Sequence, residues 1–152
     1  MPTITPFLWF DCDLAEPIAY YRSIFPEART GDVRQVGEDG PVFTATIDLC
    51  GQQLMLLNGG PVHAGFTESI SMFVGVDTQE EVDDLWTRLT AGGEPGRCGW
   101  LKDRYGLSWQ IVPTELGTLL GSPDRGRAQQ ALDAMMQMDK LDIAVLQAAY
   151  DR

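Results

Sequence analysis

The sequence predicts an α+β fold that consists of two tandem βαβββ modules followed by a helical C-terminal extension. The first observation behind this prediction is a gapless repeat, because Asp48–Leu57 and Asp103–Val112 share the frame Asp-x-x-Gly-x-x-apolar-x-apolar-apolar. The second is that Asp13 and Asp77 are each followed by apolar residues after five, eight and twelve positions. A pattern that recurs in both halves indicates a duplicated supersecondary unit.

Length and composition predict a single domain that covers residues 1–152. Apolar residues make up 44% of the chain and charged residues 22%, which is typical of a domain with one core. Within it we expect module one at about 4–58, a linker at 59–68, module two at about 69–113 and a helical tail at 114–152. The linker is placed where glycine and proline cluster and the periodicity is lost.

The first module begins with an apolar and aromatic strand at Ile4–Phe10, and a helix follows it. Asp13 is the expected N-cap of this helix, with Glu16 at the capping-box position and Pro26 as its stop. Apolar runs separated by glycine-containing turns then predict three strands. Their expected ranges are Val33–Val36, Val42–Leu49 and Leu54–Leu57.

The second module repeats this order. We expect a strand at Ser69–Val76, and then a helix that Asp77 caps, that has Glu80 at the capping-box position and that ends at Gly92–Gly93. Two further strands are predicted after it, because apolar runs flank a polar, glycine-containing turn. Their expected ranges are Arg97–Leu101 and Leu107–Val112.

The tail has no counterpart in the repeat and reads as helical. Glu115–Leu120 predicts a short helical turn, and Ser122 followed by Pro123 predicts the start of a longer helix. Lys140–Tyr150 predicts the final helix. Methionines form much of the apolar stripe of the longer helix, and such a stripe can pack against its own domain or against a second subunit. Both alternatives stay open at the level of sequence.

Charge and cysteine usage exclude several classes of partner. The net charge of −11 and the pI near 4.3 argue against nucleic acid and against an anionic membrane, because both would repel the surface. Cys12, Cys50 and Cys98 form an odd set without metal-binding spacing, which favours a reducing compartment. The chain also lacks an apolar leader and a membrane-spanning run, so we expect a cytoplasmic protein.

Several motifs resemble one family in particular. The sequence is similar to the PhnB-like, demethylubiquinone methyltransferase-like branch of the vicinal oxygen chelate superfamily, which includes glyoxalase I, bleomycin and fosfomycin resistance proteins and extradiol dioxygenases. The resemblance implies that the two modules form a cup. Fold alone does not establish an activity. The motifs that carry the resemblance are Phe7–Asp11, Tyr20–Pro26, Leu57–Pro61, Thr78–Asp83, Cys98–Asp103, Ser108–Pro113, Met136–Met138 and Leu141–Ile143.

The resemblance also implies where a metal would bind. Metal enzymes of the superfamily place one ligand on the first strand and one on the last strand of each module. The internal repeat assigns these places to Pro6 or Phe7, Met55, Ser71 and Gln110. Of these only Gln110 is a plausible oxygen donor, whereas a catalytic divalent site needs about three histidine or carboxylate ligands. We therefore expect no metal and no cofactor.

Strand alternation predicts which other side chains share the inner face with Gln110. Aromatic and apolar residues dominate this set, and a few polar residues accompany them, which is typical of a site for a small organic molecule. The alternative is that the same residues only fill space, and Gln110 itself can be a polar residue on a wet face. The candidate ligand-binding residues are Phe7, Trp9, Gln53, Met55, Leu57, Asn58, Ser71, Phe73, Trp100, Ser108 and Gln110.

No catalytic residue can be assigned from the sequence. His63 is the only histidine, and it reads either as an exposed loop residue or as a catalytic or gating residue. Four functions stay open: a metal-free binding protein that forms a homodimer, a metal-dependent lyase or dioxygenase, a methyltransferase as the family label suggests, and an assembly module built on the tail. The first is the function that the residues at the cup face favour.

Overall fold

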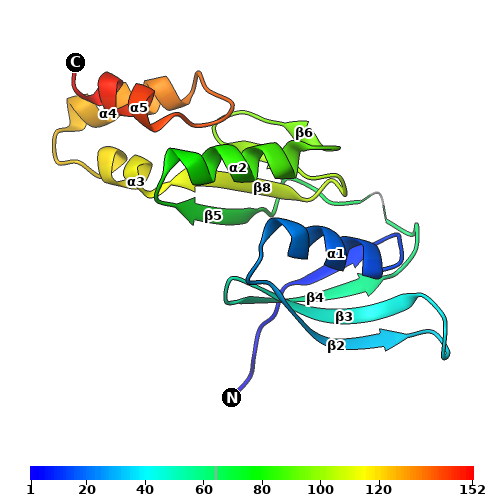
Figure 1. The fold of residues 1–152 in the computed structure, drawn as a ribbon. Coiled ribbons are helices and arrows are strands. Elements are labelled where there is room, and N and C mark those ends of the chain that lie inside the picture. The colour runs from blue at the N-terminus through cyan, green and yellow to red at the C-terminus, as the bar shows by residue number, and fades with distance from the viewer. Residues whose placement is uncertain (64) are drawn as a thin grey trace. The chain divides into compact units, whose positions relative to one another are not determined.

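The computed structural model describes residues 1–63 and 65–152 and divides into two compact units, Met1–Gly65 and Phe66–Arg152 (Figure 1). The division falls inside the predicted linker. Each unit is described by itself, so the predicted single domain and the predicted cup, which combines both sheets, stay predictions. No helix among the described residues is long and apolar enough to cross a lipid bilayer.

Unit one is a four-stranded sheet with one helix against it (Figure 1). The sheet has the order β1-β4-β3-β2, in which β1 is parallel to β4 and the other neighbours are antiparallel. Its core lies between the helix and the sheet, where Leu8, Tyr21 and Leu56 are buried. The elements are β1 (Phe7–Phe10), α1 (Ala15–Ile24), β2 (Arg29–Gln35), β3 (Val42–Leu49) and β4 (Gln52–Asn58).

Unit two repeats the topology of unit one. Its sheet has the order β5-β8-β7-β6, in which β5 is parallel to β8 and the other neighbours are antiparallel. The elements are β5 (Met72–Val76), α2 (Gln79–Thr90), β6 (Glu94–Pro95), β7 (Trp100–Lys102) and β8 (Ser108–Pro113). The predicted fold of two tandem βαβββ modules is therefore confirmed, and β6 is a short strand that the sequence did not reveal.

The repeated Asp-x-x-Gly frame is a turn that aligns the last strand of each module. In module one Asp48 Oδ1 accepts a hydrogen bond from the backbone N–H of Gly51 at 2.8 Å. In module two the buried Asp103 accepts from two backbone N–H groups of its own turn and from the Trp109 indole N–H at 2.9 Å. Gly51 and Gly106 both have positive φ, at +90° and +85°, which glycine adopts without strain.

The expected caps of the first two helices are each wrong by one residue. Helix α1 begins after Leu14, and the Asp13 carboxylate instead accepts from the backbone N–H groups of Ala15 and Val42, both at 3.0 Å. Asp13 therefore links the start of the helix to β3. The carboxylate thus still reaches the first helical residue, although Asp13 stands one position before the N-cap Leu14.

Thr78 caps α2, where Asp77 was expected. Its hydroxyl oxygen accepts from the Glu81 backbone N–H at 3.2 Å and donates to the Glu81 carboxylate at 3.2 Å, so Glu81 and not Glu80 pairs with the cap residue. The carboxylate of Asp77 accepts from the Thr114 hydroxyl at 3.0 Å. Asp77 thus connects the end of β5 to the helix that follows β8.

The C-terminal extension packs within its own unit. Its helices are α3 (Thr114–Leu120), α4 (Arg125–Met135) and α5 (Ile143–Tyr150). Asp124 caps α4, so the expected cap at Ser122 is wrong by two residues. The extension has its own buried cluster, against which Met135 and Met138 also pack, and its buried members are Leu116, Leu119, Ala131, Leu141 and Leu146. Met135 and Met138 thus pack inside the subunit, Met136 is 51% exposed, and packing of the stripe against a second subunit stays a prediction.

Candidate functional site

Each sheet has one face covered by its helix and one open face. In module one Leu8, Leu54 and Leu56 are buried, whereas Phe7 is 50% exposed and Met55 is 39% exposed. This alternation follows from the strand geometry, in which successive side chains point to opposite faces. The predicted ligand face is therefore the face that α1 leaves open.

The register of module one places most of its predicted site residues in two rows. Phe7 pairs with Met55, and Trp9 pairs with Leu57, so these four side chains share the open face. Gln53 is an exposed residue of the same face and pairs with Asp48. Asn58 is the exception, because it pairs with Phe10 in the buried row and does not belong to the open face.

The segment after β4 folds against Trp9. The indole N–H of Trp9 donates to the Gly60 carbonyl oxygen at 2.9 Å, and the His63 ring meets the indole edge-on with 4.6 Å between centroids. Gly59 lies so close to the indole that a Cβ atom there would collide with it. His63 is exposed, so the reading of a loop residue fits its position, and its contact places it beside a predicted ligand-binding residue.

The open face of module two also consists of two rows. In the first row Phe73 and Trp100 pair with Gln110 from opposite sides. In the second row Glu94 pairs with Lys102, and Lys102 pairs with Ser108. Phe73 is 63% exposed. The register thus brings together the predicted residues of β5, β7 and β8 and adds two charged residues that the prediction did not contain.

Gln110 and Ser71 contact each other. The Gln110 side-chain amide donates to the Ser71 hydroxyl oxygen at 3.0 Å, and both residues are half-buried. The amide N–H of Gln110 therefore has a protein acceptor. Gln110 lies in the open-face row as predicted, but its neighbour Ser71 competes with any ligand for this hydrogen bond.

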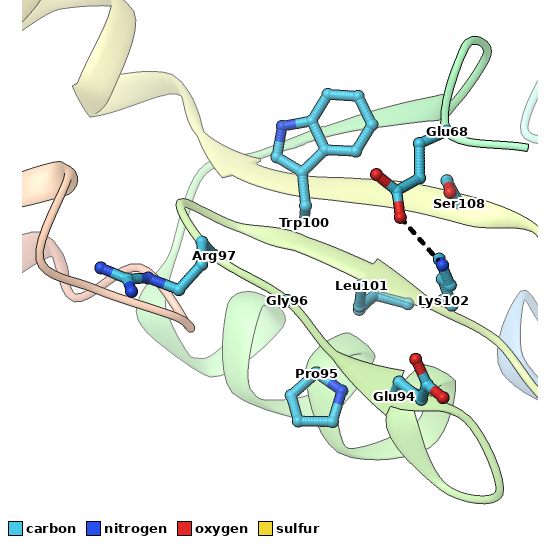
Figure 2. Close-up of a pocket in the computed structure, with 9 residues that line it drawn as sticks. All are labelled: Glu68, Glu94, Pro95, Gly96, Arg97, Trp100, Leu101, Lys102 and Ser108. Carbon is cyan, nitrogen blue, oxygen red and sulfur yellow. Dashed lines mark ion pairs between the residues drawn. The ribbon is translucent and has the colours of Figure 1, made fainter.

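A pocket of about 350 Å³ opens on this face, lined by the second row and by Trp100 of the first row (Figure 2). Lys102 Nζ lies 2.9 Å from Glu68 Oε1, and this hydrogen bond holds the pKa of Glu68 below and that of Lys102 above their usual ranges. Ser108 is only 1% exposed, and its hydroxyl finds no hydrogen-bond partner in the described part of the chain. Trp100 stands on the same side of the sheet as the Glu68–Lys102 pair (Figure 2).

The structure changes one of the four implied metal positions. Phe7 pairs with Met55, and Phe73 pairs with Gln110, so Phe73 and not Ser71 is the counterpart of Phe7. The reason is the connection between strand and helix, which is two residues shorter in module two than in module one. Alignment on the aspartates Asp13 and Asp77 therefore misplaced the strand by two residues.

These residues do not fit a divalent metal. Phenylalanine offers no donor atom, the Met55 thioether is a soft ligand, and Gln110, whose amide nitrogen donates to Ser71, provides a single amide oxygen. Across residues 1–63 and 65–152, no group of three histidine, cysteine, aspartate or glutamate side chains is placed to hold a metal ion. The metal positions of the fold are occupied by side chains that suit apolar contact.

The comparisons with known proteins agree with this fold. The sequence profile of the 3-demethylubiquinone-9 3-methyltransferase family matches residues 2–112. The PhnB protein from Bacillus cereus is 30% identical, and the match covers 74% of this chain and 99% of that one with a TM-score of 0.67. No curated protein matches the sequence at a significant level.

More distant structures show the fold alone. A Pseudomonas aeruginosa protein is 19% identical over 74% of this chain and 98% of that one, with a TM-score of 0.58. A fosfomycin resistance protein from Listeria monocytogenes, complexed with Mn(II) and sulfate, is 15% identical over 74% and 89%, with a TM-score of 0.53. Helices α3–α5 lie beyond the matched residues 2–112. The duplicated part of the chain thus belongs to the PhnB, or 3-demethylubiquinone-9 3-methyltransferase, family and has the glyoxalase-like fold of the vicinal oxygen chelate proteins.

Proposed function

We propose that this PhnB-family protein binds a small organic molecule on the open faces of its sheets without a divalent metal. The observation that carries the proposal is the identity of the residues at the metal positions of the fold. These residues are Phe7, Met55, Phe73 and Gln110, and they provide one amide and three apolar side chains. Such a set favours an apolar ligand surface over a coordinated ion.

The exposure of the aromatic residues supports the same function. Phe7 and Phe73 each leave half or more of their surface in water, and both lie on an edge strand, β1 and β5, on the sheet face opposite the helix. Transfer of apolar area out of water contributes about 25 cal/mol per Å², so a ligand that covers these rings gains affinity from them. The polar groups nearby, chiefly Gln110 and Ser108, can orient such a ligand.

Native mass spectrometry of the full chain purified under gentle conditions tests the proposal. We expect a bound organic molecule of low mass, released by denaturation, and retention of this molecule after exposure to a chelator. Elemental analysis of the same sample provides the contrasting result. A stoichiometric divalent metal whose removal also removes the ligand would overturn the proposal in favour of a metal-dependent lyase or dioxygenase.

A matched pair of variants tests whether the ligand binds at the open face. Phe73→Ala removes an exposed ring from the proposed ligand surface, and we expect it to weaken ligand retention. Phe43→Ala removes the same side chain from β3, where Phe43 is 46% exposed but lies outside the open-face rows, and we expect it to leave retention unchanged. Equal effects of the two substitutions would argue against the open face as the site.

The family description names a methyltransferase, and this activity fits the residues less well. Adenosyl cofactors usually bind over a glycine-rich turn between a strand and a helix in a parallel sheet. Here Gly59–Gly60 follow β4 and pack on Trp9, and Gly92–Gly93 follow α2. Calorimetric titration with S-adenosylmethionine should give no binding heat, and a clear isotherm would restore this candidate.

We also propose that the chain forms a homodimer in a reducing compartment such as the cytoplasm. Val33 and Val36 leave apolar side chains exposed on the β2–β3 hairpin, which supports association. Light scattering measures the molar mass of the unaltered chain and of the Val36→Asp variant. We expect a dimeric mass for the unaltered chain and a lower mass for the variant, and a monomeric mass for both would refute the dimer.

The cysteines fit a reducing compartment. Burial and neighbouring carboxylates raise the pKa of the Cys12 and Cys50 thiols, which suits unreactive, reduced cysteines.

A further inference from the structure

One turn of module two supplies three residues of the pocket lining. Gly96, Arg97 and Trp100 all line the pocket, and they belong to the tight turn at residues 96–100, which we call the pocket turn. Its backbone is closed by two hydrogen bonds, from the Gly96 N–H to the Trp100 carbonyl oxygen at 2.8 Å and from the Trp100 N–H to the Arg97 carbonyl oxygen at 3.0 Å. The Trp100 indole stands on the pocket side of the sheet (Figure 2). The shape of the pocket turn therefore decides where the aromatic wall of the pocket lies.

The middle of the pocket turn has a backbone conformation that amino acids with a side chain rarely adopt. Cys98 has φ +59° and Gly99 has φ +85°, so two consecutive residues are left-handed. Glycine adopts this conformation without strain, whereas a residue such as cysteine keeps it only where the surrounding structure holds it. Interactions from outside the turn are therefore needed to fix its shape.

The C-terminal extension provides these interactions through residues 136–143, which run from the end of α4 into the first residue of α5 and which we call the bridging segment. The Cys98 N–H donates to the Met138 carbonyl oxygen at 2.8 Å, and the Gly99 N–H donates to the Asp139 carbonyl oxygen at 2.7 Å. Both left-handed residues thus use their backbone donors on the extension. The extension, which is not part of the duplicated modules, fixes the turn.

Close packing holds the pocket turn between β8 and the bridging segment. Gly99 is buried, and a Cβ atom there would lie 3.0 Å from the Ile111 carbonyl oxygen and 3.1 Å from Leu141 Cδ1. The Arg97 side chain adds a contact, because its Nη2 donates to the Met136 carbonyl oxygen at 3.0 Å. Figure 2 shows this side chain extending away from the pocket's ion pair. A shift of the bridging segment would therefore be transmitted to the pocket turn.

Helix α2 holds the bridging segment in turn. Gln79, the first residue of α2, accepts from the Ile143 N–H at 2.8 Å through its Oε1 and donates to the Leu141 carbonyl oxygen at 3.0 Å through its Nε2. One side chain thus pairs with both a donor and an acceptor of the segment's backbone, as a neighbouring strand would. The Lys140 ammonium adds an ion pair with Asp83 of α2 at 2.8 Å.

From this series of contacts we propose that the C-terminal extension sets the ligand preference of the module-two pocket and that Gln79 is a positioning residue for this pocket. Gln79 holds the bridging segment, the segment holds the pocket turn, and the turn places Trp100 beside the ligand. This inference rests on the proposed small-molecule binding and adds the element that shapes the site. The duplicated module alone does not determine the geometry of this pocket.

A matched pair of glutamine substitutions, Gln79→Ala and Gln147→Ala, tests the role of Gln79. Both glutamines are half-buried on helices of unit two, and each donates from Nε2 to an aspartate four residues later, Asp83 or Asp151. Gln79 also reaches the bridging segment. In the part of the chain that the structure describes, the side-chain hydrogen bonds of Gln147 stay within α5 and its C-cap residue.

Hydrogen exchange in the ¹⁵N-labelled full chain, at a temperature at which each variant is folded, reports on the pocket turn. We expect Gln79→Ala to speed exchange of the Cys98 and Gly99 N–H groups and to shift the Trp100 indole signal. The Trp109 indole N–H, a donor in the core of unit two, should keep its protection. The control variant should leave all of these signals unchanged.

Titration with 2-phenylethanol, an uncharged aromatic probe, measures the effect on the pocket. The Trp100 indole N–H signal reports binding, and its absence in Trp100→Phe assigns it. We expect Gln79→Ala to weaken binding by about three- to tenfold, because the aromatic wall loses its preorganised position, and Gln147→Ala to bind as the unaltered chain does. Lys140→Ala, which removes the ion pair with α2, should act in the same direction with a smaller effect and replaces Gln79→Ala if that variant does not fold.

Two results would overturn the proposal. A lower melting temperature of Gln79→Ala with unchanged exchange at Cys98 and Gly99 and unchanged probe affinity would show that Gln79 serves stability alone. No shift of the Trp100 signal with the probe in the unaltered chain would show that the pocket turn does not contact a ligand of this kind. Both results leave the proposed function in place, because native mass spectrometry and the Phe73→Ala comparison test it without the pocket turn.

Discussion

The buried turn carboxylate of module two offers the sharpest test of how this fold is stabilised. Asp103 is 2% exposed and accepts three hydrogen bonds: from the backbone N–H groups of Tyr105 at 2.9 Å and Leu107 at 3.2 Å, and from the Trp109 indole N–H at 2.9 Å. Asp103→Ala leaves all three donors without this acceptor. Removing the partner of a buried donor costs about 1–3 kcal/mol.

The expected loss for Asp103→Ala is about 3–5 kcal/mol, since the Tyr105 N–H is half-buried and water can replace part of its bond. The repeat provides a matched control in the same frame. Asp48 accepts one hydrogen bond, from Gly51 at 2.8 Å, in an exposed turn. Asp48→Ala should therefore cost only about 1 kcal/mol.

Hydrogen exchange of the tryptophan indole N–H groups, combined with urea denaturation, measures both effects. The Trp109 indole N–H should lose protection in Asp103→Ala and keep it in Asp48→Ala. The Trp9 indole N–H, which donates to Gly60 in the other unit, reports whether unit one is affected. Equal destabilisation by the two substitutions would refute the argument that burial of the carboxylate sets its contribution.

Three further outcomes are expected. Leu146→Ala removes a fully buried side chain of the extension and should cost about 2–5 kcal/mol in a denaturant titration, whereas the half-exposed Val145→Ala should change stability by less than about 0.5 kcal/mol. Gly59→Ala pushes a Cβ atom into the β1 indole and should broaden or shift its N–H signal, and an unchanged spectrum would contradict the close packing. The lowered pKa of Glu68 means that its ion pair stabilises the fold above the usual carboxyl range and is lost as pH falls through the lowered value, so the melting temperatures of Glu68→Gln and the unaltered chain should converge in acid and diverge near neutrality.

The fold could be predicted because the signals that define it are local. Strand β3 begins and ends where the sequence places it, at Val42 and Leu49, since alternation and flanking turns mark both ends. Strand β6 could not be found, because Glu94–Pro95 has two residues, includes a proline and shows no alternation. Its existence depends on pairing with β7, which is a tertiary contact.

Part of the candidate site could also be predicted, because strand alternation is a local signal. Face membership follows from alternation, so the rows around Met55 and Gln110 could be derived from the sequence. The charged half of the pocket could not, because Glu94 reaches it only through β6 and Glu68 only through a loop before β5. In a sequence, such residues look like ordinary solvated charges. Likewise, the missing partner of Ser108 is a property of packing and has no sequence signal.

The C-terminal extension makes the two copies unequal. Val112 belongs to the same strand face as Gln110, yet it packs against the buried cluster of helices α3–α5, whereas its repeat counterpart Leu57 has no such cover within unit one. The extension therefore covers the open face of module two at Val112. The open faces of the two modules are therefore not equivalent, and a substitution in the tail can change the module-two face without replacing any residue of its sheet.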